Sequence, residues 1–111
     1  MRTALGQELP DQIVENYFDT LVNQFYKILP IWESGEPTLP IYIHSLQREM
    51  IGCRSLMDEL RGDGRYMTLL AILQRLADGG LTVQEVRSDV FRAISICKQL
   101  REKYAKEEGV P

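Results

Sequence analysis

The stretch TVQEVRSDVFRAISICKQLREKY, residues 82–104, decides the fold. Thr82 and Glu85 stand three residues apart at its start, the spacing of a capping box at a helix N-terminus. Apolar residues then recur at alternating spacings of three and four, which places them on one face of a helix. The members of this stripe are Val83, Val86, Val90, Ala93, Cys97, Leu100 and Tyr104. The stretch therefore predicts a helix over residues 83–106 with one buried face.

Three earlier segments show the same helical periodicity and are separated by glycine and proline. The predicted helices cover residues 10–29, 39–60 and 64–77. Pro10 suits the first turn of the first helix, and Pro30 is expected to end it. Thr38 and Asp63 are expected to cap the second and third helices. Short connections favour antiparallel neighbours. The sequence thus predicts a single all-α domain over the 111 residues, a mostly antiparallel four-helix bundle.

The composition is that of a folded protein, with 44% hydrophobic and 26% charged residues. No apolar run approaches the ~20 residues of a membrane span, and residues 1–10 lack the pattern of a signal peptide. Cys53 and Cys97 both fall on apolar stripes, so we expect two buried, reduced thiols. These features predict a soluble protein of the cytoplasm that makes no membrane contact.

Residues that could carry chemistry are few. His44 is the single histidine, and neither Pro40 nor Arg48, four residues away on either side, would orient it as a general base. It also lacks a glutamate at the i, i+3 spacing that bundle metal sites use. A nucleophilic cysteine needs a basic neighbour to lower its pKa, and the only histidine, His44, is expected to face away from Cys53. We therefore expect no enzyme activity, no metal and no cofactor.

Basic residues on the last helix allow a nucleic-acid contact as a lower-ranked interpretation. These residues are Arg87, Arg92, Lys98, Arg101, Lys103 and Lys106. Five acidic residues, Glu85, Asp89, Glu102, Glu107 and Glu108, lie on this helix or directly after it, and the whole chain carries a net charge of -3. Nucleic-acid-binding surfaces usually show a strongly basic stripe. A solvated face with paired charges fits this helix better, so a nucleic-acid partner is not favoured.

The first helix has more apolar surface than one core contact needs. Its apolar residues cover roughly 220° of the helix, about twice the width of an ordinary buried stripe. One edge is expected to face the core, namely Ile13, Tyr17, Leu21 and Ile28. The other edge is the candidate partner contact, formed by Phe18, Val22, Tyr26 and Leu29 together with Trp32. A second copy of the chain is the favoured cover, with the first helix of each copy packed against that of the other. The alternative is a first helix flanked on both sides by its own chain.

These patterns favour a small, non-catalytic interaction module that acts through protein–protein contacts, including self-association. A small-molecule-binding regulator is the first alternative. Its pocket would be lined by Tyr17, Tyr42, Met50, Met57 and Tyr66. Two positions stay open. Trp32 either covers the end of the bundle or contacts a partner. Gly52, inside the second helix, marks either a close approach by another backbone or an exposed face, with close approach slightly favoured.

Overall fold

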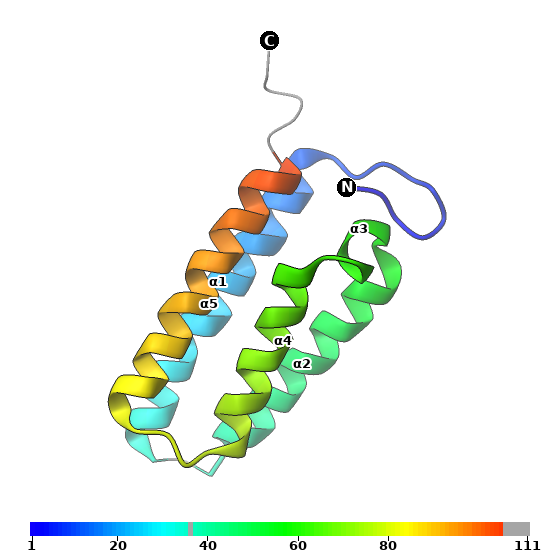
Figure 1. The fold of residues 1–111 in the computed structure, drawn as a ribbon. Coiled ribbons are helices and arrows are strands. Elements are labelled where there is room, and N and C mark those ends of the chain that lie inside the picture. The colour runs from blue at the N-terminus through cyan, green and yellow to red at the C-terminus, as the bar shows by residue number, and fades with distance from the viewer. Residues whose placement is uncertain (36, 106–111) are drawn as a thin grey trace.

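The structure is a computed structural model that describes residues 1–35 and 37–105. That part of the chain contains five helices and no strand. They are α1 (Asp11–Ser34), α2 (Leu39–Leu56), α3 (Asp58–Arg61), α4 (Gly64–Asp78) and α5 (Val83–Ala105). The four long helices lie lengthwise beside one another, and each long helix runs opposite to the one before it in the chain (Figure 1). The prediction of an all-α protein is confirmed.

The long helices enclose one apolar core, but they pack unequally. α1 lies against α5 along most of its length, and α4 packs on both α5 and α2. The contact between α1 and α2 is much smaller. The largest fully buried side chains include Tyr66, Phe18, Phe25, Ile28, Ile43, Met50, Leu60, Leu69, Leu73 and Leu100. The arrangement is therefore closed on three sides and looser where α1 meets α2.

Two predicted helix starts are confirmed by their hydrogen bonds. The Thr82 amide donates to Glu85 Oε1 at 2.9 Å, and the Glu85 amide donates to Thr82 Oγ1 at 3.2 Å. Asp63 accepts two amide N–H groups from the first turn of α4, at 2.9 and 3.2 Å. Thr38 occupies the predicted N-cap position of α2, but its side chain makes no capping hydrogen bond. Residue 106, the expected end of the last helix, lies outside the described residues.

Pro30 does not end the first helix, contrary to the sequence prediction. α1 continues through Pro30 to Ser34 and ends where Gly35 adopts φ 70°, with its amide donating to Trp32 O at 3.1 Å. A proline without an N–H removes one helical hydrogen bond. Ile28 is fully buried before it and Trp32 packs on the core after it. Burial on both sides of Pro30 outweighs the lost bond, and the glycine provides the actual stop.

The predicted helix over residues 39–60 is interrupted. Met57 has φ -116° and ψ 118°, an extended conformation that separates α2 from α3. The N-terminal residues supply partners for the backbone groups that this break releases. Thr3 forms an antiparallel bridge with Met57, and the Ala4 amide donates to Leu56 O at 2.6 Å. A long-range contact therefore overrides the local helical pattern.

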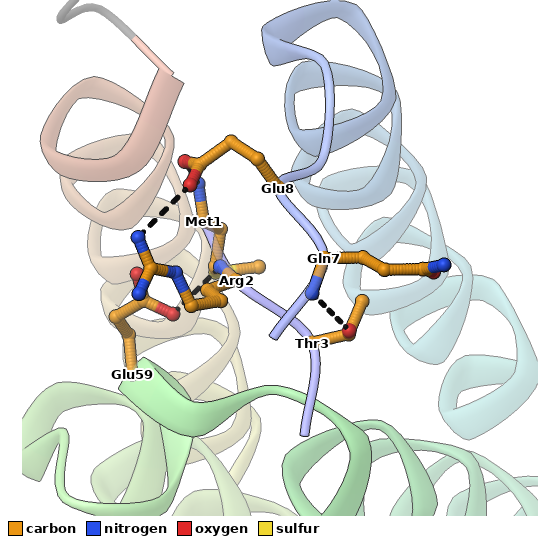
Figure 2. A network of polar contacts seen from close by, with 6 residues as sticks. All are labelled: Met1, Arg2, Thr3, Gln7, Glu8 and Glu59. Atoms are coloured by element: carbon orange, nitrogen blue, oxygen red, sulfur yellow. Dashed lines mark hydrogen bonds and ion pairs between the residues drawn. The ribbon is translucent and has the colours of Figure 1, made fainter. Parts of the chain in front are cut away.

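Residues 1–9, which we call the N-terminal loop, fold back over this break. Figure 2 shows the polar side of the contact, where the Arg2 amide donates to Glu59 Oε1 at 2.9 Å. Within the loop, the Gln7 amide donates to Thr3 Oγ1 at 3.1 Å, and Glu8 lies 3.5 Å from the Arg2 guanidinium. Met1 is only 5% exposed and joins the core. The loop thus covers one end of the core, a role that its sequence did not indicate.

Candidate partner-binding surface

The five residues predicted to contact a partner divide into three groups. Phe18 is fully buried and its ring stacks on that of Tyr104, so its placement on an outer edge is wrong. Val22 and Leu29 are half-buried, and Tyr26 is 44% exposed. Trp32 is half-buried against the core cluster, as expected for a side chain that covers the end of the bundle. Val22, Tyr26 and Leu29 therefore remain on a surface that a partner could reach.

The sequence prediction assigned the wrong part of the wide apolar arc of α1 to the core. Its centre, not one edge, faces the core, through Val14, Phe18, Leu21, Phe25 and Ile28. Ile13, which was expected inside, is 51% exposed. Tyr17 on the same edge is half-buried and faces α2, while Val22 and Tyr26 lie along α5. The arc is wide because the chain itself contacts α1 on both sides, although neither side is fully covered.

Val22, Tyr26 and Leu29 belong to a longer surface feature, which we call the outer seam. It is formed by two stripes, each one residue further along the chain than a buried stripe of the same helix. On α1 the stripe consists of Glu15, Asp19, Val22, Tyr26, Leu29 and Glu33. On α5 it consists of Arg87, Phe91, Ile94, Lys98 and Arg101, of which Ile94 is itself buried. Both follow the four–three spacing of residues that line a helix–helix seam.

An exposed aromatic pair occupies the middle of the outer seam. The rings of Tyr26 and Phe91 meet edge to face, with centroids 6.1 Å apart and an interplanar angle of 79°. Phe91 is 50% exposed, slightly more than Tyr26. Each ring partly covers the other, yet both keep a large apolar face in water. Aromatic side chains in this situation are enriched at the centres of protein–protein interfaces.

Ion pairs lie towards both ends of the outer seam. Arg87 contacts Glu33 at 3.2 Å at one end. At the other end, Arg101 Nε lies 3.0 Å from Asp19 Oδ1 and its Nη2 lies 3.7 Å from Glu15 Oε1. The contact with Asp19 is an ion pair rather than an aligned hydrogen bond. The charged residues of the α1 stripe are all acidic and those of the α5 stripe are all basic. The seam therefore carries opposite charges on its two helices.

Comparison with known proteins returned no matching family model, curated protein or solved structure. Residues 1–35 and 37–105 contain no cluster of three histidine, cysteine, aspartate or glutamate side chains that could hold a metal ion. None of the helices in this part of the chain combines the length and the apolar character that a membrane span requires.

A second surface lies on the opposite side of α1. The loose contact between α1 and α2 leaves an open groove of about 340 Å³. Its lining includes Ile13, Asn16, Tyr17, Thr20, Leu21, Gln24, Leu46, Glu49 and Met50. The floor is mainly apolar, and the amide, hydroxyl and carboxylate groups are at the rim. We call this feature the α1–α2 groove.

The groove only partly matches the pocket predicted from the sequence. Tyr17 and Met50 line it, and Tyr66 lies behind Tyr17, fully buried. The two tyrosine hydroxyls are 2.6 Å apart, and Tyr66 donates to Met50 O at 2.8 Å. Burial raises the pKa of both phenols well above the usual range. Met57 does not line the groove, and the Tyr42 hydroxyl bonds instead to Gln24 O at 2.9 Å.

Asp63 and His44 are two further polar residues of interest, and they lie in different surroundings. The buried Asp63 carboxylate accepts from Lys103 Nζ at 3.1 Å and from the Tyr104 hydroxyl, which connects the start of α4 to the end of α5. Burial alone would raise the pKa of Asp63, but the bonds from Tyr104, Lys103 and the Tyr66 amide outweigh it and lower the pKa. His44 is exposed and contacts Gln47 at 3.1 Å. The sequence indicated the cap at Asp63 but not its two partners on α5.

The cysteines differ from each other. Cys97 is fully buried, and burial raises the pKa of its thiol to about 12. Cys53 is half-buried, so the prediction of full burial is wrong for this residue. Burial also raises its pKa, although a hydrogen bond with Tyr17 opposes this. Both are free thiols whose raised pKa values disfavour the nucleophilic thiolate.

Proposed function

We propose that this protein is a small, non-catalytic interaction module that binds another protein through the outer seam. The observation that carries the proposal is the exposed Tyr26–Phe91 pair, flanked by ion pairs on both sides. An apolar aromatic centre within a charged rim is the usual composition of a specific interface. We further propose that the long helices form a mostly antiparallel four-helix bundle and that the protein works in the cytoplasm.

The properties of the two cysteines and of the single histidine support a function without catalysis. Raised pKa values keep both cysteines protonated near neutral pH, and His44 is exposed beside a glutamine. General acid–base catalysis needs a positioned group whose pKa lies near the working pH. The same residues do not favour a bound cofactor, and the basic residues of α5 do not favour a nucleic-acid partner. On α5, the basic residues Arg87 and Arg101 are engaged with acids of α1.

A photo-crosslinking experiment tests the proposal. Phe91 is replaced by a photoreactive phenylalanine analogue in the full chain, and Arg65, an exposed residue of α4, receives the same analogue as a control. Irradiation in the source cell should give discrete covalent products from position 91 and none of equal yield from position 65. The masses of the products identify the partner as a second copy or another protein. Equal, diffuse labelling from both positions would show that the outer seam is an ordinary solvated surface.

The α1–α2 groove supports a second candidate function, the binding of a small ligand. Its volume of about 340 Å³ lies at the lower end of the range for small-molecule sites. The Tyr17 and Tyr66 hydroxyls bond to each other, so the rim groups of Asn16, Gln24 and Glu49 would recognise polar atoms. A ligand with an apolar body and a donor or cationic end fits this lining.

Nuclear magnetic resonance titration with small aromatic and aliphatic amines tests this second candidate. Saturable shifts should be confined to amides around Asn16, Thr20 and Glu49, and Thr20→Phe should abolish them by filling the groove. The variant Asn23→Phe places the same ring on an exposed position of α1 and serves as the control. Shifts that persist in Thr20→Phe would exclude the groove as the binding site.

A further inference from the structure

The charges of the outer seam are ordered along its length as well as between its helices. α1 and α5 run in opposite directions (Figure 1). Glu33 therefore lies beside Arg87 near one end, and Asp19 lies beside Arg101 near the other. The aromatic pair lies between these ends. At every level of the seam, an acidic or apolar residue of α1 therefore stands beside a basic or apolar residue of α5.

A second copy can cover this surface in two symmetric ways. In a two-fold dimer the axis lies in the plane of the interface and each copy contributes the same residues. If the axis is parallel to the helices, the rotation leaves each residue at the same height along the helices. α1 of one copy then lies on α5 of the other. Glu33 then faces Arg87 of the second copy, and the two aromatic pairs meet at the centre.

The other arrangement opposes like charges. If the axis runs across the helices, α1 lies on α1 and the two ends exchange places. Glu33 then faces Asp19 of the second copy, while Arg87 faces Arg101. Opposed like charges are unfavourable, whereas complementary charges speed encounter and fix the register of the two surfaces. The charge pattern therefore selects the axis parallel to the helices.

We propose that this protein forms a two-fold dimer through the outer seam, with α1 of each copy packed on α5 of the other. The inference rests on the proposed function and adds both the partner and its orientation. The four–three spacing of both stripes suits lengthwise helix packing. A helix of 23 residues is about 35 Å long, and two adjacent helices of roughly 10 Å diameter offer about 700 Å². This area is close to the roughly 800 Å² per partner of a standard interface.

Charge reversal at one end of the seam tests the dimer and its orientation together. Glu33→Arg and Arg87→Glu are prepared separately, and association is measured by sedimentation at low salt. Each variant alone should dimerise about tenfold more weakly than the wild type, because its two symmetric contacts now oppose like charges. An equimolar mixture should recover heterodimers, because the arginine introduced at position 33 of one chain then faces the glutamate introduced at position 87 of the other. The ion pair within each chain is lost alike in the separate and mixed samples, so a folding effect cannot produce this recovery.

The variant Asp58→Arg is the control, because Asp58 also forms an exposed ion pair within the chain, with Arg61 at 3.3 Å. It should leave dimerisation unchanged. Three results would overturn the inference: a wild type that stays monomeric at several hundred micromolar, a dimer indifferent to both reversals, or stronger self-association of Glu33→Arg. The last would indicate the crossed arrangement. None of these results excludes a different protein as partner, which crosslinking at position 91 would still reveal by its mass.

Discussion

The two sides of α1 differ sharply, although they belong to one helix. Towards α5 it presents large apolar side chains in an unbroken series, including Phe18 and Phe25, and the two helices lie together along most of their length. Towards α2 its series alternates with polar residues such as Asn16, Thr20 and Gln24, and a groove remains. Polar side chains keep their hydration by staying near the surface. The identity of a few interfacial residues therefore decides whether two neighbouring helices pack closely or stay apart.

The largest expected effect comes from the closed side. Phe18→Ala should lower the free energy of unfolding by about 3–5 kcal/mol, because a fully buried ring is replaced by a cavity. Tyr26→Ala, two turns further along the same helix, should cost only about 1 kcal/mol, since Tyr26 loses mainly its edge-to-face contact with Phe91. Urea unfolding of both variants measures the difference. Equal losses would contradict the placement of Phe18 in the core and Tyr26 outside it.

The attachment of α5 should also depend on pH through Asp63. Its lowered pKa means that the carboxylate contributes stability above the ordinary carboxyl pKa, and this contribution is lost as the pH falls through the folded-state value. Wild-type stability should therefore fall below about pH 4. Asp63→Asn should be less stable by about 1–2 kcal/mol near neutral pH and show a shallower acid decline. Denaturant titrations between pH 2 and 7 compare the two; parallel profiles would rule out this role of the carboxylate.

On the open side, removing a polar group should draw the helices together. Thr20→Leu should raise stability by about 0.5–1 kcal/mol, because the new side chain can contact Leu46 and Met50 across the groove. Asn23→Leu makes a similar gain in helix propensity at an exposed position and is the matched control. Thermal unfolding should show the larger gain for Thr20→Leu. A gain no greater than the control would mean that the polar residues do not hold the groove open.

The smallest effect concerns α2 itself. A Cβ at Gly52 would meet no neighbouring atom within 4 Å, so the predicted close approach by another backbone is not found among residues 1–35 and 37–105. Gly52→Ala should add about 0.5–1 kcal/mol by improving helix propensity. Calorimetry of the variant checks this expectation. A loss of stability or of self-association would instead indicate that another copy packs closely on this face.

The sequence predicted helix boundaries correctly where they depend on contacts between residues close together in the chain. The capping residues Thr82 and Glu85 marked the start of α5, and Asp63 marked the start of α4, because each cap is made within one turn of chain. Pro30 misled because the burial of Ile28 and Trp32 around it outweighs one absent hydrogen bond. Such tertiary compensation has no local signature.

The candidate surface was predicted only in part, for a related reason. The excess width of the apolar arc on α1 correctly indicated that more than one neighbour contacts it. Periodicity gives the width of such an arc but not the direction of the core. The sequence therefore predicted Phe18 outside the core and Ile13 inside it, whereas Phe18 is buried and Ile13 is exposed. Phe91 and Arg87 entered the site through packing of α5 on α1, which no single segment could show. The sequence did contain one signal for this site. Both α1 and α5 carry a second stripe, one residue further along the chain than the buried stripe.

The break at Met57 has a consequence for the order of folding. The helices themselves depend on contacts close in sequence, which form quickly. The N-terminal loop instead joins residues as far as 57 positions apart, from Arg2 to Glu59. Closing so long a segment of chain carries an entropic cost that must be met before its contacts contribute. Residues 39–61 can therefore extend as one continuous helix early in folding, and arrival of the loop would later divide it into α2 and α3.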